Sequence, residues 1–218
     1  MEFHGWNGLR KTISLLASNN CSTISGPVIY LDINKSCTSG VNTFYCTRKF
    51  EDGQWAYNIV DRPQNLLGLP SRVYWLPWSD GRCQQIQTST LNNAGVDIFL
   101  TSSMSGCHFI GCEKSVAHVA PNSGSDNNNS PTGHAFKQMH ETLEDSGVDL
   151  QKINNNFSLS PINHVDNTLP SINKFVYGGG EYPPRACVIG IKYNDAWFFA
   201  YQEKTCYSTN YAKWYKIN

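Results

Sequence analysis

The chain has 218 residues, 40% of them hydrophobic and 12% aromatic, so it can bury a sizeable core, and we expect residues 1–218 to form a single domain. Its 17 basic and 17 acidic residues cancel, so no charge excess points to a direct nucleic-acid partner. No apolar run is long enough for Sec export or for a membrane-spanning helix, so we expect no membrane partner and reduced thiols.

The N-terminal half is expected to form one helix followed by several strands. Apolar residues at Leu9, Ile13 and Leu16 are spaced as on one face of a helix, which we place over residues 6–17. Runs rich in β-branched and aromatic residues, bounded by turn formers, predict the strands that follow. These runs cover residues 28–33, 41–46, 55–60, 72–78 and 96–100.

The composition changes after residue 120. Residues 121–130 are rich in Asn, Ser, Gly and Asp, which is typical of a surface loop. We expect a helix over residues 130–147, capped by Ser130 at its start and ended by Gly147. The mostly polar residues 151–172 are expected to form a long irregular connection.

The C-terminal part returns to strands. Residues 186–201 predict a β-hairpin that turns near Asn194 and Asp195, and residues 207–217 predict a closing strand. Strands therefore outnumber the two or three expected helices. The pattern predicts an α+β fold, a single domain in which a central β-sandwich or mixed sheets are flanked by helices.

Residues 99–107, FLTSSMSGC, have the clearest chemical character. They indicate an apolar strand that ends in small residues and presents the thiol of Cys107. A cysteine nucleophile must be ionised, and a neighbouring imidazole is the usual means near neutral pH. His118 follows eleven residues later in a short β-like run, and two adjacent antiparallel strands would bring the two groups together. Gly106 permits a strained turn and the close approach of a substrate carbonyl.

Other interpretations of the eight cysteines and six histidines stay open. An even number of cysteines is compatible with a disulfide framework, which would consume Cys107 and leave a non-enzymatic β-sandwich binding module. His108 adjoins Cys107, but on a strand its side chain would face the opposite side. His134 and His140 have no Cys, Asp or Glu at a convincing metal-ligand spacing, so we expect neither a metal nor another cofactor.

Three aromatic residues of the run 72–78 also have two interpretations. Tyr74, Trp75 and Trp78 could line a recognition surface. They fit the buried core of a strand at least as well. The sequence is compatible with both interpretations.

The pattern Thr101-x-x-x-Ser105-Gly106-Cys107, with His118 downstream, resembles the signature of a family of toxins. It is similar to the LSGC motif of the cytotoxic-necrotizing-factor type of glutamine deamidase and, more distantly, to the chemoreceptor glutamine deamidases. The resemblance is more extensive to Burkholderia lethal factor-like glutamine deamidase toxins, which are single domains of nearly this length. It extends over residues 75–78, 96–100, 186–191 and 198–202.

The resemblance implies a role for each residue of the motif. It implies a necrotizing-factor-type catalytic domain with Cys107 as the nucleophile, His118 as its base and Thr101 as the residue that orients the imidazole. Backbone N–H groups of the turn at Ser105 and Gly106 are then expected to stabilise the oxyanion.

The resemblance also implies the reaction and its targets. The thiolate would attack the carboxamide carbon of a substrate Gln, ammonia would leave, and water would release Glu from the thioester. Attack by a Lys amine instead would make the protein a transglutaminase. The implied host substrates are an RNA helicase of translation initiation, favoured by the closer resemblance, or Rho-type GTPases. We expect a monomeric toxin that is made in a bacterial cytosol and delivered to the host cell cytosol.

Overall fold

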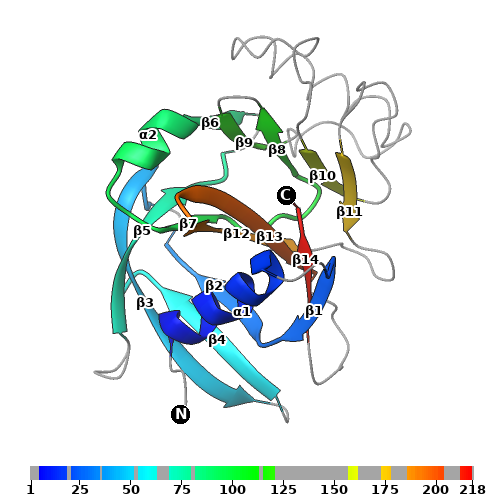
Figure 1. The fold of residues 1–218 in the computed structure, drawn as a ribbon. Helices are drawn as coiled ribbons and strands as arrows, with labels where there is room; N and C mark the ends of the chain where they lie inside the picture. The colour runs from blue at the N-terminus through cyan, green and yellow to red at the C-terminus, as the bar shows by residue number, and fades with distance from the viewer. Residues whose placement is uncertain are drawn as a thin grey trace, which may run out of the picture.

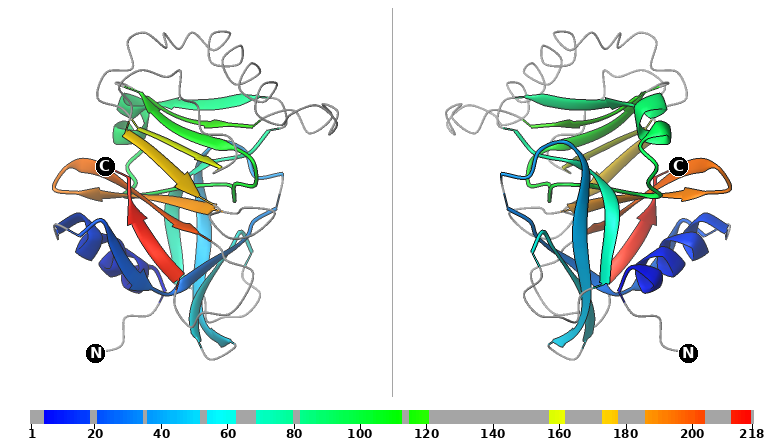
Figure 2. Two further views of the ribbon diagram at one scale, coloured as in Figure 1. Left: turned by 90° about the vertical axis from the view of Figure 1, so that its right-hand side faces the viewer. Right: turned by 90° about the vertical axis from the view of Figure 1, so that its left-hand side faces the viewer.

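The computed structural model describes residues 5–18, 21–34, 36–51, 54–62, 69–79, 82–112, 115–120, 157–161, 173–177, 186–203 and 212–217. Within these ranges the chain forms three layers (Figure 1). A nine-stranded sheet lies in the middle, helix α1 (Trp6–Ser18) packs on one face of it, and a five-stranded sheet covers the other face (Figure 2).

The nine-stranded sheet has the order β1-β14-β13-β12-β7-β5-β3-β4-β2. Its strands are β1 (Thr23–Gly26), β2 (Val28–Asp32), β3 (Gly40–Glu51), β4 (Gln54–Val60), β5 (Leu69–Leu76), β7 (Ile98–Thr101), β12 (Ala186–Tyr193), β13 (Ala196–Glu203) and β14 (Ala212–Lys216). Most neighbours are antiparallel, but β2 and β4 run parallel, and so do β5 and β7, with Leu76 opposite Thr101. The carboxyl ends of β5 and β7 therefore meet at one edge of the sheet.

The five-stranded sheet has the order β11-β10-β8-β9-β6. Its strands are β6 (Cys83–Gln87), β8 (His108–Cys112), β9 (Ser115–Val119), β10 (Phe157–Pro161) and β11 (Asn173–Tyr177), and helix α2 (Thr88–Asn93) follows β6. Strands β8 and β9 pair antiparallel, with Phe109 opposite His118. This pairing positions the candidate site.

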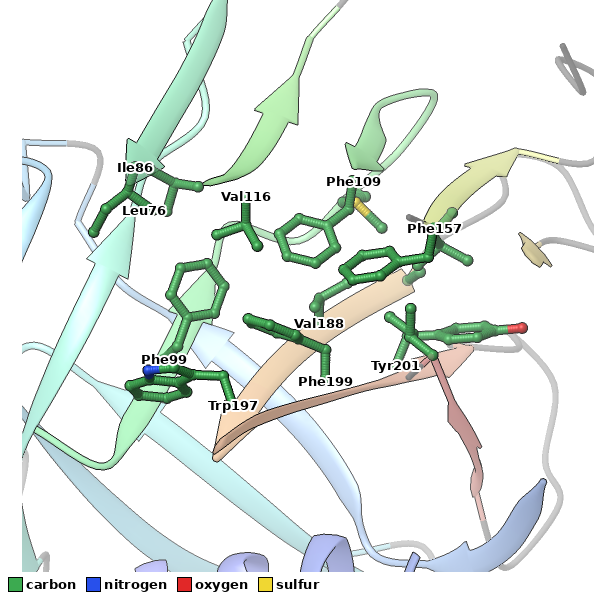
Figure 3. Close-up of a cluster of buried hydrophobic side chains, with 14 of the residues drawn as sticks. Leu76, Ile86, Phe99, Phe109, Val116, Phe157, Val188, Trp197, Phe199 and Tyr201 are labelled. Atoms are coloured by element: carbon green, nitrogen blue, oxygen red, sulfur yellow. The ribbon is translucent and has the colours of Figure 1, made fainter. Parts of the chain in front are cut away.

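Alternation along the central strands divides the interior into two cores. On β7, Phe99 faces the five-stranded sheet, whereas Ile98 and Leu100 belong to the core beneath α1. The rings of Phe99 and Phe199 meet edge to face, with centroids 5.6 Å apart, in the core between the sheets (Figure 3). Since side chains on one face recur every second residue, Thr101 shares the face of Phe99 and also looks toward the five-stranded sheet.

The expectation of an α+β fold flanked by helices is wrong, because the described part of the chain is mostly β. Only α1, which confirms the helix expected over residues 6–17, and the short α2 are helical there. The second face of the large sheet buries its apolar side chains against another sheet rather than against helices. No helix in the described ranges is long and apolar enough to cross a membrane.

Most individual strand predictions agree with the structure. The hairpin predicted over residues 186–201 is confirmed, and Asn194 and Asp195 at its turn have φ angles of 49° and 62°, as two-residue hairpin turns require. The irregular connection expected over residues 151–172 is wrong in part, because β10 lies within it. The helix expected over 130–147 and the loop at 121–130 lie outside the described residues.

Candidate active site

Cys107 and His118 come to one face of the five-stranded sheet. His118 on β9 pairs with Phe109 on β8, so both side chains point to the same side. Cys107 lies two residues before Phe109 and packs in the same core between the sheets. Cys107 directly precedes β8, so period-two alternation puts its thiol on the same side of the sheet as the imidazole. His108 faces the other side, where its Nδ1 lies 2.9 Å from Ser160 Oγ.

Backbone hydrogen bonds and a left-handed glycine define the turn before Cys107. The backbone of Met104 forms two hydrogen bonds with Ala186, at 2.8 and 3.0 Å, and its side chain is fully buried. Gly106 has a φ of 85°, in the left-handed region that a residue with a Cβ adopts only with strain. Ser105 is exposed at the surface. The turn therefore presents Cys107 and its neighbouring backbone N–H groups in a fixed orientation.

A hydrogen bond between the two sheets orients the imidazole. Thr101 Oγ1, on the large sheet, lies 2.6 Å from His118 Nδ1 and donates its own hydrogen bond to the carbonyl oxygen of Leu76 at 2.8 Å. A hydroxyl has a single proton, so Oγ1 must accept the proton on Nδ1. The neutral imidazole is therefore protonated on Nδ1 and carries its lone pair on Nε2.

The environment of His118 keeps this Nε2 unprotonated. The side chain is 1% exposed, and burial lowers the pKa of His118 to about 4. Within the described part of the chain, Nε2 has no hydrogen-bond partner. At neutral pH the histidine is thus uncharged, which favours proton transfer from a thiol over a preformed thiolate–imidazolium pair.

Acid is expected to destabilise the fold through His118. Below an unfolded pKa of about 6.5 the unfolded chain binds a proton that the folded chain does not accept until about pH 4. The free energy of unfolding should therefore fall by about 3 kcal/mol as the pH drops through this window, and be fully recovered above it. Urea denaturation at pH 7.5 and pH 4 measures the change, and His118→Asn should show a pH dependence smaller by this amount.

Tyr177, the last residue of β11, is a site residue that the sequence analysis missed. Its hydroxyl donates a hydrogen bond to the carbonyl oxygen of Cys107 at 2.8 Å, and its side chain is fully buried. Burial raises the pKa of Tyr177 well above its usual range, and ionisation of the nearby Cys107 acts in the same direction. The hydroxyl therefore stays protonated and fixes the peptide group that follows the thiol.

Two of the alternative chemistries find no support at this site. In the described ranges no three side chains of His, Cys, Asp or Glu are grouped so that they could hold a metal ion. Cys107 is a thiol and not half of a disulfide. The same is true of five further cysteines, Cys21, Cys37, Cys46, Cys83 and Cys187. A disulfide framework that consumes Cys107 is therefore not present.

Comparisons with known proteins agree with the resemblance noted in the sequence. The family model of Burkholderia lethal factor 1 matches residues 48–127, a range that includes Thr101, Cys107 and His118. The crystal structure of the C-terminal domain of CNFy from Yersinia pseudotuberculosis is similar over 94% of each chain, with a TM-score of 0.52 and 10% sequence identity. No curated protein sequence matches the chain. The resemblance to lethal-factor and necrotizing-factor domains is thereby confirmed, and the structural likeness shows a shared fold.

Proposed function

We propose that this chain is a toxin-type, cysteine-dependent protein glutamine deamidase. The observation that carries the proposal is the hydrogen-bonded series from Leu76 through Thr101 to His118, which leaves an unprotonated Nε2 on the sheet face that also bears Cys107. The match to the lethal-factor model, which covers these residues, supports the same class of activity.

The first half of the proposed reaction forms a thioester. Nε2 of His118 takes the proton of Cys107, and the sulfur attacks the carboxamide carbon of the substrate Gln. Thr101 Oγ1 accepts a hydrogen bond from the transient imidazolium but cannot offset its charge. The cation is therefore short-lived and returns its proton to the departing nitrogen, so that ammonia leaves.

The second half consumes water. Nε2, neutral again, takes a proton from water, and the hydroxide attacks the thioester carbon to release Glu and the thiol. One Gln carboxamide and one water thus become one carboxyl group and one ammonia. Backbone N–H groups of the turn at Ser105 to Cys107 are the donors we assign to both oxyanions, at about 3 kcal/mol for each donor.

The burial of the site supports a long substrate side chain. Cys107 and His118 are 4% and 1% exposed, so the reacting carbon must be carried inward from the surface of the partner protein. Gln, with two methylene groups before its carboxamide, reaches further than Asn. We place the target among host regulatory proteins, with an RNA helicase of translation initiation preferred to a Rho-type GTPase because of the lethal-factor match.

Mass spectrometry of a eukaryotic cell lysate tests this function. Lysate treated with the wild-type protein should contain a Gln converted to Glu, and lysate treated with Cys107→Ser should not. The converted peptide also names the target. Gln–Lys cross-links in place of Glu would make the protein a transglutaminase, and identical peptides in both samples from several lysates would refute the proposal.

A further inference from the structure

Trp78 is an exposed aromatic residue whose backbone lies next to the residues that hold Thr101. The stretch from Tyr74 to Trp78 contains three aromatic residues, and the structure separates them. Tyr74 and Trp75 are 9% and 4% exposed and belong to the two cores, whereas Trp78 is 39% exposed. The core interpretation therefore holds for the first two residues and fails for Trp78, whose large apolar ring is left in contact with solvent.

The backbone of Trp78 is tied to the hydrogen bonds that orient His118. Its N–H donates to Ser102 Oγ at 2.8 Å, and the N–H of Ser102 donates to the Leu76 carbonyl oxygen at 3.3 Å. The same carbonyl accepts the hydroxyl of Thr101. Trp78 thus lies just after the carboxyl end of β5, next to the end of β7 that bears Thr101. The hydrogen bond to Ser102 holds its backbone in place.

We propose that Trp78 is the specificity residue on which the polypeptide flanking the target Gln packs, an inference that rests on the proposed deamidase function. The buried thiol and imidazole can receive only a side chain, so the substrate backbone must remain outside, at the rim. At that rim the indole offers a large apolar surface with only two side-chain torsions to order, on a backbone that is already anchored. The site therefore selects Gln in a protein segment with an adjacent apolar side chain over free glutamine.

Kinetic comparison of Trp78 variants tests the inference. The probe is the Gln that the wild-type protein converts in a eukaryotic lysate, followed at serial dilutions of that lysate. Trp78→Ala should lower the initial rate at high dilution, which reports kcat/KM, by about 30-fold, as loss of an aromatic anchor does. The rate should recover toward the wild-type value as lysate becomes concentrated, because KM rather than kcat is affected. Trp78→Phe should retain most of the activity.

Two controls separate substrate contact from structure. Alkylation of Cys107 by iodoacetamide should proceed at the same rate in Trp78→Ala as in the wild type. Phe50→Ala, which removes another exposed aromatic side chain, should leave conversion unchanged. Phe50 lies ten residues along β3 from Gly40, the partner of Trp75, and so about 33 Å from this edge.

Each contrary result has its own meaning. Equal conversion by Trp78→Ala and the wild type would overturn the inference and leave the deamidase function standing. A parallel fall in the alkylation rate would also overturn it, since Trp78 would then support the fold of the site. If the wild type converts no Gln at all, the proposed function itself fails.

Discussion

Cys107→Ser is expected to reduce Gln-to-Glu conversion by at least about 10⁴-fold. The substitution keeps the shape of the side chain but replaces a thiol with a hydroxyl that is far harder to deprotonate. His118, whose pKa is lowered to about 4, is too weak a base to offset that difference. Single-turnover conversion of the target Gln, quantified by mass spectrometry, measures the loss.

The matched control for this variant is Cys46→Ser. Cys46 is as buried as Cys107 but lies in the core beneath α1, where burial raises the pKa of its thiol to about 12. Both substitutions place a hydroxyl in an apolar core and should lower the free energy of unfolding by a similar amount, about 1 kcal/mol. Only Cys107→Ser should lose activity. Conversion that survives Cys107→Ser would rule out this thiol as the nucleophile.

The placement of Cys107 and His118 on one side of the five-stranded sheet could be predicted because it is local. Cys107 and His118 lie on one hairpin, and period-two alternation is enough to put both on the inner face and His108 on the outer face. Thr101 came only from the resemblance to the toxin family. Nothing in its local sequence shows that β7 would run parallel to β5 and bring its hydroxyl under the other sheet.

The roles of Tyr177 and Leu76 and the fold class could not be predicted because they depend on long-range contacts. Tyr177 reaches the carbonyl of Cys107 from a strand seventy residues further along the chain. The orienting acceptor on Leu76 is a backbone carbonyl, which no residue type reveals. The fold class failed for a related reason. Short strands such as β6 and β10 have weak patterns of their own and are strands because their neighbours in the sheet supply hydrogen bonds.

His118→Asn is expected to lower conversion by about 10²- to 10⁴-fold, the usual contribution of a general base. The Asn side-chain amide can still donate to Thr101 Oγ1 in place of the Nδ1 proton. It has no nitrogen lone pair in the position of Nε2, so the proton of Cys107 has no acceptor. The hydrogen bond to the large sheet is thereby retained while the base is removed, and initial rates with the lysate target measure the difference.

The tautomer offers an independent readout of the same argument. In ¹⁵N-labelled wild-type protein, the imidazole nitrogen shifts of His118 should show a protonated Nδ1 and an unprotonated Nε2 at neutral pH. Thr101→Val removes the acceptor for the Nδ1 proton, so the preference for the Nδ1-protonated tautomer should be lost and conversion should slow. Thr101→Ser should restore both the tautomer and the rate of conversion. A protonated Nε2 in the wild type would contradict the mechanism, because Thr101 would then leave no base facing Cys107.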